Sequence, residues 1–250
     1  MPIIEQIFKE TNLSLKDIEL ICINDGSTDN SLQILEEYAK NDDRIKIYSQ
    51  KNQGQGAAKN YALTLFKGDY VMFLDQDDYM ELNACEIAYS YITNYDVELV
   101  IFSARTFSKF PKNEAIEKHM QPYRYFVDLL YQKFNLMDLS NYMDFINISP
   151  WAKIYKKNLF ENMYLKFITK VIYEDITFLM ALIAQNPKSL IIKEILYNYN
   201  YPREGQVISS QKMDVLSIFD SYRYSEKIFK TMNCYQRVCL GFLGFRQNLF

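Results

Sequence analysis

The sequence of 250 residues contains few of the residue types on which several common active sites are built. Its one histidine is His119, so a histidine triad or a histidine-rich metal site cannot form. The four cysteines lack the spacing of metal ligands: Cys22, Cys85, Cys234 and Cys239. Because Cys22 lies in an apolar, strand-like run, we expect reduced thiols in a cytoplasmic protein.

Long apolar runs and basic clusters are also missing. No continuous apolar stretch reaches the length that spans a membrane, and residues 1–13 carry charges within a short apolar pattern, unlike a secretory signal. The net charge is −3 and the basic residues are scattered, so no nucleic-acid partner is expected. With 49% apolar residues, the chain can still bury one sizeable core.

Three carboxylates follow the apolar run at residues 70–74, in the tetrad Asp75-Gln76-Asp77-Asp78. The run predicts an interior strand of an α/β sheet, and ligands of such sheets collect at the carboxyl ends of strands. Carboxylate oxygens are preferred by Mg²⁺ and Mn²⁺, and Mg²⁺ commonly joins one or two of them to substrate phosphates. The tetrad predicts either a metal–diphosphate site or a solvated acidic turn.

A second strand end lies upstream, where the run at residues 18–23 leads into the sequence NDGSTD at residues 24–29. Asp25 stands where this strand ends. The polar residues after it are competent helix caps, and apolar residues then recur at helical spacing. A tight hairpin turn at Asp25 would need a second strand instead. The pattern therefore favours a strand, a loop and a helix.

The sequence NQGQGAAKN at residues 52–60 follows a short strand candidate at residues 45–48 and enters a helix. Paired glycines before a helix are typical of a loop beside phosphates, and equally of a flexible helix entry. The segment is not a dinucleotide fingerprint, because Lys59 stands in place of the third glycine. The chain contains no Walker lysine motif either.

Together, these segments resemble the nucleotide-sugar half of a family-two glycosyltransferase of the GT-A fold. The resemblance rests on NDGSTD, NQG with AAKN, and FLDQDD at residues 73–78, and it continues with WAKIYKK at 151–157, YED at 173–175 and YPREG at 201–205. It covers about residues 13 to 210. It implies an α/β class with a Rossmann-like, mostly parallel sheet flanked by helices and a helical C-terminal part.

The resemblance also implies roles for individual residues. Asp25 would accept a hydrogen bond from the base of the donor, usually uracil. Asp75 would lie near the ribose and the metal, and Asp77 would ligate Mg²⁺ or Mn²⁺ between the two phosphates. Lys59 would add positive charge beside these phosphates or point into solvent.

Asp175 resembles the catalytic base of this family, which takes the proton of the acceptor hydroxyl. It follows Glu174 and precedes a strongly apolar segment, so it is expected at the start of a helix. Acidic residues there also stabilise the helix dipole without any catalysis, and on local sequence alone that explanation is the stronger one. A single base without a covalent intermediate would invert the anomeric carbon.

The resemblance divides the chain into three parts. Residues 1–105 would bind the nucleotide sugar, residues 106–210 the acceptor with the base, and residues 211–250 would form a helical extension. The expected partners are a UDP-sugar and a glycan or lipid-linked glycan of the lipopolysaccharide or capsule type. Apolar residues at helical spacing in residues 213–230 favour a helix that closes the domain, or one that contacts the inner face of the membrane.

The family's first strand is expected to be missing, since the chain starts within the helix that follows it. This would leave a central place in the sheet empty. A catalytically impaired remnant that binds nucleotide sugar is therefore the alternative to an active enzyme. A sugar nucleotidyltransferase is a third and weaker alternative, because that class has a Gly-rich loop with an arginine directly after its first strand, which this sequence lacks. Trp151 is expected either to stack on an acceptor sugar or to lie in the core.

Overall fold

The computed structural model describes residues 17–107, 120–139, 146–170, 173–201 and 217–232. The features predicted at residues 1–13, His119, residues 202–205, Cys234 and Cys239 lie outside these ranges. The strands are β1 (Leu20–Asp25), β2 (Ile45–Gln50), β3 (Tyr70–Met72), β4 (Tyr79–Met80), β5 (Leu99–Phe107), β6 (Lys133–Asn135), β7 (Lys153–Lys156) and β8 (Lys188–Asn200). The α-helices are α2 (Ser31–Ala39), α3 (Gln55–Leu65), α4 (Ala84–Asn94), α6 (Glu174–Gln185) and α7 (Ser217–Thr231).

The predicted strand–loop–helix units occur where the sequence patterns placed them. Helix α2 follows β1, which confirms a helix rather than a hairpin after Asp25. Helix α3 follows β2, and the predicted strand before the acidic tetrad is β3, which ends at Met72. Helix α6 begins at Glu174, so Asp175 lies in its first turn as expected.

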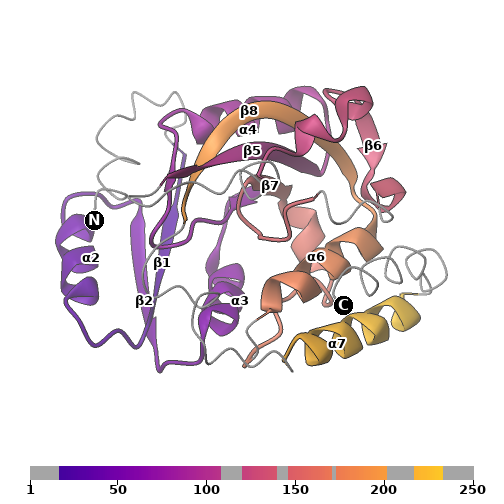
Figure 1. Cartoon of the computed structure of the whole chain (residues 1–250). Helices are drawn as coiled ribbons and strands as arrows, with labels where there is room; N and C mark the ends of the chain where they lie inside the picture. Colours follow the sequence, from indigo (N-terminus) through magenta and orange to yellow (C-terminus); the bar gives the residue numbers. More distant parts are fainter. Residues whose placement is uncertain (1–16, 108–119, 140–145, 171–172, 202–216, 233–250) are drawn as a thin grey trace.

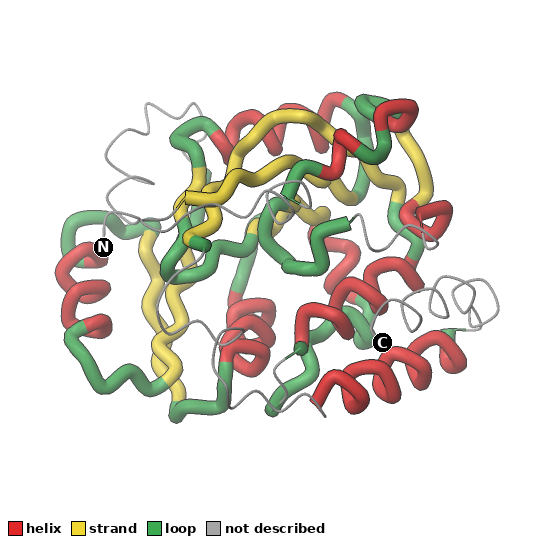
Figure 2. The backbone as a smooth tube through the Cα atoms, viewed as in Figure 1, coloured by secondary structure: helices red, strands yellow, loops and turns green. Residues whose placement is uncertain are grey.

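The large sheet contains six strands in the order β3-β7-β5-β8-β4, with β6 pairing further along β8. Figure 2 draws the strands in yellow. The α/β class is confirmed, but the expected mostly parallel sheet is a mixed one. Strands β5 and β8 run parallel, whereas β7, β4 and β6 run antiparallel to their partners. The apolar pattern of a strand predicts its burial and gives no information on its direction, which explains the difference.

Strands β1 and β2 form a separate parallel pair. Among the described strands, β1 pairs with β2 and β3 pairs with β7, so no ladder joins β1 to β3. That the first strand of the family is missing stays a prediction, because residues 1–16 lie outside the described ranges. The two sheets are tied at one end by Glu19, whose carboxylate accepts hydrogen bonds from the backbone N–H groups of Lys67 and Gly68.

The large sheet is buried on both faces. Along β5, Leu99 and Ile101 pack into the core under α6 and α7, whereas Val100, Phe102 and Ala104 pack on the side of α4. Figure 1 shows the helices on these two sides of the sheet. Alternate residues of a strand point to opposite faces, so a continuous apolar run fits a strand that is covered twice.

An aromatic cluster fixes the chain just before the acidic tetrad. The ring of Phe73 makes edge-to-face contacts with Tyr155, Phe167 and Phe178 at centroid distances of 5.6–5.8 Å. Such pairs add to the free energy of burial because the positive edge of one ring meets the negative face of another. Since Asp75 lies two residues further on, the core holds the beginning of the acidic turn in place.

Helix α7 confirms the helix predicted within residues 213–230. It packs beside α6 (Figure 1), with Tyr222, Ile228 and Phe229 buried in the core. Ser221 Oγ donates a hydrogen bond to the carbonyl of Tyr173, directly before α6. The described part of α7 thus covers the domain, as expected for a closing helix. Among the described residues, no helix is both long and apolar enough to cross a membrane.

Candidate functional site

The acidic tetrad separates into one buried carboxylate and two more accessible ones. Asp78 is buried, and its carboxylate accepts hydrogen bonds from the hydroxyl of Tyr197 (2.7 Å) and the backbone N–H of Asn200 (2.9 Å). Burial raises the pKa of Asp78 to about 7. Asp75 and Asp77 are only partly buried. Asp78 therefore anchors the turn to β8.

Asp75 and Asp77 suit a divalent cation that takes its remaining ligands from a substrate. Mg²⁺ usually binds one or two protein carboxylates together with phosphate oxygens and water. In the part of the chain that the structure describes, no group of three or more His, Cys, Asp or Glu side chains could hold a metal ion by itself. A metal–diphosphate site at Asp75 and Asp77 stays a prediction.

Asp25 organises the loop that enters α3. Its carboxylate accepts hydrogen bonds from the backbone N–H groups of Gln53 (2.9 Å) and Gly54 (2.8 Å) and from the side chain of Gln50 (2.7 Å). Gly54, at φ 87°, has the left-handed backbone that favours glycine. A carboxylate offers about four acceptor positions, so Asp25 retains one for the base of a donor. The predicted base contact stays a prediction.

Lys59 lies on α3 and points toward the start of α6. Its Nζ is 3.3 Å from Oδ1 of Asp175 and 3.5 Å from Oε1 of Glu174. Burial would lower the pKa of Lys59, but the negative charges of Asp175, Asp75 and Glu174 outweigh it and raise the pKa. The structure therefore gives Lys59 carboxylate partners, where the sequence had suggested phosphates or solvent.

The acid pair at the start of α6 consists of a buried and an accessible carboxylate. The side chain of Glu174 is 1% exposed and that of Asp175 is 22% exposed. Burial, together with the charge of Asp175, raises the pKa of Glu174 to about 7, and Lys59 opposes this shift. A base must reach the hydroxyl from which it takes a proton, so Asp175 is the better placed of the two.

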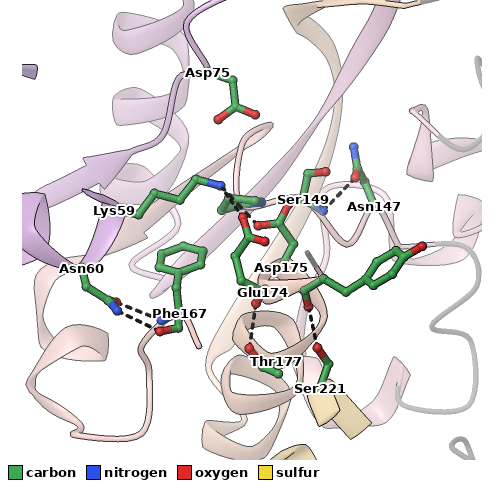
Figure 3. Close-up of polar contacts among 12 residues, drawn as sticks. Lys59, Asn60, Asp75, Asn147, Ser149, Phe167, Glu174, Asp175, Thr177 and Ser221 are labelled. Carbon is green, nitrogen blue, oxygen red and sulfur yellow. Dashed lines mark hydrogen bonds and ion pairs between the residues drawn. The ribbon is translucent and has the colours of Figure 1, made fainter. Parts of the chain in front are cut away.

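Figure 3 shows Asp75, Lys59, Glu174 and Asp175 around one region of the molecule. These residues come from the turn after β3, from α3 and from α6, so the fold brings together segments that are about 100 residues apart in the sequence. Asp25 is linked to this region through the loop that enters α3. The fold thus unites the predicted donor-side acid, the lysine and the predicted base.

Trp151 is part of the core. The residue is 2% exposed, and its ring stacks on Tyr197 (4.5 Å between centroids, 4° between planes) and on Tyr199 (5.1 Å, 30°). The ring of Trp151 therefore has no exposed face on which a sugar could stack. Of the two expectations for Trp151, core packing is confirmed. Tyr199 also stacks on Tyr201, with 5.6 Å between ring centroids.

A buried lysine supports the loop beside Asp175. Lys153 Nζ donates hydrogen bonds to the carbonyls of Asn147 (2.8 Å) and Ser149 (2.6 Å). Burial lowers the pKa of Lys153 to about 7, although the charge of Asp175 opposes this shift. A neutral amine has two N–H groups, which match the two carbonyls. Lys153 therefore fixes the chain before Trp151 without needing a charged partner.

Lys153 is expected to make the stability of the protein rise with pH. Its pKa near 7 in the folded state lies below the unfolded value of about 10.4, so between these pH values the unfolded chain binds the extra proton. From pH 7 to about 8.5, where unfolded cysteines begin to titrate, the free energy of unfolding should gain up to about 1.4 kcal/mol per pH unit relative to Lys153→Met. Urea unfolding of wild type and Lys153→Met between pH 7 and about 8.5 tests this prediction. Free energies of unfolding that change with pH in the same way for both proteins would contradict it.

The sequence interpretation missed Gly56, Asn60 and Glu174 as site residues. Lys59 and Asn60 follow Gly56 by three and four residues, a spacing that places each of them on the same face of α3 as Gly56. A helix face that contains a glycine and polar residues could have indicated, from the sequence alone, that α3 packs closely against another segment. Glu174 had no comparable signal, because its burial depends on how α3 and α6 pack.

A sheet whose strand ends carry carboxylates, opposite a helix that begins with an acid pair, is the architecture of a GT-A glycosyltransferase. The chain belongs to the family described as glycosyl transferase family 2, whose model matches residues 2–163. The match includes the acidic tetrad and the segment WAKIYKK, and it ends before Asp175.

Two relatives show how the chain compares in sequence. Glycosyltransferase GlyA of Streptococcus pneumoniae is 32% identical over 200 residues, which are 77% of this chain and 27% of that protein. The cholesterol galactosyltransferase of Borreliella burgdorferi is 28% identical over 249 residues, which are 94% of this chain and 67% of that protein. The chain thus spans about a quarter of the first relative and two thirds of the second.

Solved structures confirm the GT-A fold. The S. aureus TarS fragment 1–349 in complex with UDP-GlcNAc superimposes with a TM-score of 0.69 at 20% identity, covering 91% of this chain and 63% of that one. The mannosyltransferase PcManGT of Pyrobaculum calidifontis, in complex with GDP-Man and Mn²⁺, gives a TM-score of 0.59 at 15% identity, covering 96% and 69%. At these identities the likeness concerns the fold.

Proposed function

We propose that the chain transfers a sugar from a UDP-sugar to a glycan or lipid-linked glycan of the cell surface, with inversion at the anomeric carbon. The observation that carries this proposal is the grouping of Asp75, Lys59 and Asp175 at one site of a family-2 fold (Figure 3). The structural neighbours in complex with UDP-GlcNAc, UDP and GDP-Man support a nucleotide-sugar donor.

In the proposed reaction, Asp25 accepts a hydrogen bond from the uracil, and Asp75 and Asp77 would hold Mg²⁺ or Mn²⁺. The cation, when bound, acts as a Lewis acid that neutralises charge on the leaving UDP. Asp175 takes the proton of the acceptor hydroxyl, whose oxygen bonds to the anomeric carbon as the bond to UDP breaks. A single displacement of this kind inverts the configuration.

The acceptor and the place of action belong to the same proposal. Relatives include a chondroitin synthase of Escherichia coli, which supports a polysaccharide product. We place the enzyme in the cytoplasm, at the inner face of the membrane, where lipid-linked precursors would be available. Phe219, Tyr224 and Lys227 are exposed on α7, where Arg223 and Lys230 form ion pairs with Asp220 and Glu226 of the same helix.

The donor claim is tested by isothermal titration of the protein with UDP, with and without Mn²⁺, and by UDP release from a panel of UDP-sugars. We expect binding that requires Mn²⁺ and release of UDP from at least one donor. A protein that binds no UDP in the presence of Mn²⁺ would contradict the proposal.

The second candidate is a module that binds nucleotide sugar without turnover. The observation that favours it is the separation of β1 from β3, since the strand ends that carry Asp25 and Asp75 belong to different sheets. Metal-dependent UDP binding without UDP release from any donor, in the presence of candidate acceptors, would select this function over the first.

A further inference from the structure

Helix α3 contacts the segment that leads into α6 without a side chain between them. A Cβ atom placed on Gly56 would lie 2.7 Å from the carbonyl oxygen of Ile168 and 3.4 Å from Cγ of Glu174. Atoms do not approach a backbone oxygen this closely, so the packing requires glycine at this position. The backbone of α3 at Gly56 therefore packs directly against the backbone at Ile168, in the segment before α6.

Asn60 fixes the same two segments by directional bonds. Its side-chain amide donates to the carbonyl of Phe167 (2.8 Å) and accepts from the N–H of Phe167 (2.9 Å) (Figure 3). The ring of Phe167 in turn stacks on Phe178 of α6, with 4.2 Å between centroids and 2° between planes. Helix α3 is therefore held in a defined position relative to α6.

Lys59 lies between Gly56 and Asn60 in this contact. Its side chain is 12% exposed and lies over the ring of Phe167, with Nζ 5.1 Å from the ring centroid. It forms ion pairs with the buried Glu174 and with the accessible Asp175. A charge that is held by packing and by two carboxylates has little freedom to move toward solvent.

We propose that Lys59 is a positioning residue for Asp175: it orients the carboxylate of the base toward the acceptor and neutralises Glu174 behind it. The proposal rests on the proposed function, because it assigns Asp175 the role of base. Without Lys59, Asp175 would lose the ion pair that fixes its orientation, and the pKa of the buried Glu174 would rise further. Binding of the donor phosphates by Lys59 is the competing role.

The two roles differ in the kinetic constant that they affect. Lys59→Met should lower kcat by on the order of a hundredfold, since small misplacements of a reacting group have effects of this size, and should change UDP–Mn²⁺ affinity less than about twofold. Lys59→Arg should restore part of kcat because it keeps the charge. Lys46→Met, on the exposed side of β2, is the control and should match wild type. Weakened UDP binding with kcat unchanged would overturn the proposal.

A double-mutant cycle with Asp175→Asn provides the second test. If Lys59 acts through Asp175, adding Lys59→Met to Asp175→Asn should change kcat less than about twofold. Effects that multiply would overturn the proposal. If the wild-type protein binds UDP but does not turn over, the same four proteins are compared by urea unfolding. Non-additive shifts of the unfolding midpoint support the positioning contact, and additive shifts overturn it. A wild type that binds no UDP contradicts the proposed function separately.

Discussion

Asp175→Asn is expected to lower kcat by a hundredfold to ten-thousandfold while UDP–Mn²⁺ affinity stays close to that of wild type. Asparagine has nearly the shape of aspartate, and its side-chain oxygen can still accept the contact from Lys59, which is 3.3 Å long in the native protein. It cannot take a proton from a hydroxyl. The loss should therefore fall on turnover, measured as UDP release with a matching acceptor.

The competing role for Asp175 is to stabilise the start of α6. In that case Asp175→Asn should cost at most about 1 kcal/mol in the free energy of unfolding, because asparagine is tolerated at helix starts nearly as well as aspartate. Turnover within a few-fold of wild type would refute the catalytic role. Urea unfolding of the variant separates the two roles, since a base contributes to rate without a comparable effect on stability.

Asp77→Ala is expected to abolish the dependence of UDP binding on Mn²⁺ and to weaken that binding more than about a hundredfold. A cation bound by two protein carboxylates loses half of its protein ligands, and changes to residues that merely support a metal ligand already cost about ten- to a hundredfold. Isothermal titration with UDP at fixed Mn²⁺ measures the loss. Transfer should fall together with binding.

The control for Asp77 is Asp43→Ala, which removes an exposed carboxylate between α2 and β2 and changes the net charge equally. It should leave metal-dependent binding unchanged. If Asp77→Ala bound UDP and Mn²⁺ as tightly as the control, the assignment of the metal to the end of β3 would be wrong. Thermal unfolding of both variants checks that they fold.

The strands and helices around the site could be predicted because each has a local signal. Apolar runs identified β1, β2 and β3, and helical spacing after polar loops identified α2 and α3. Strand direction could not be predicted, because it depends on which strand a segment meets in the fold. Asp78 illustrates the same limit, since only the partners Tyr197 and Asn200, about 120 residues away, distinguish it from Asp77.

The site residues divide in the same way. The motifs of the sequence named Asp75, Asp77 and Asp175 as candidates, and their roles stay predictions. The surroundings of Lys59 could not, since its partners Glu174 and Asp175 are more than 110 residues away along the chain. The local sequence predicted either solvent or donor phosphates around Lys59. The structure shows carboxylates there instead, because the fold packs α3 against the start of α6.

The glycine contact of α3 affects how such enzymes can be recombined. The segment that would bind the donor and the segment that would carry the base meet backbone to backbone at Gly56 and Ile168. A chimera joined at the boundary proposed near residue 105 would exchange one side of this contact and keep the other. Two related enzymes would give a folded chimera only if both have a glycine at this position of the helix and a matching loop. The helix and the loop should therefore be taken from the same enzyme.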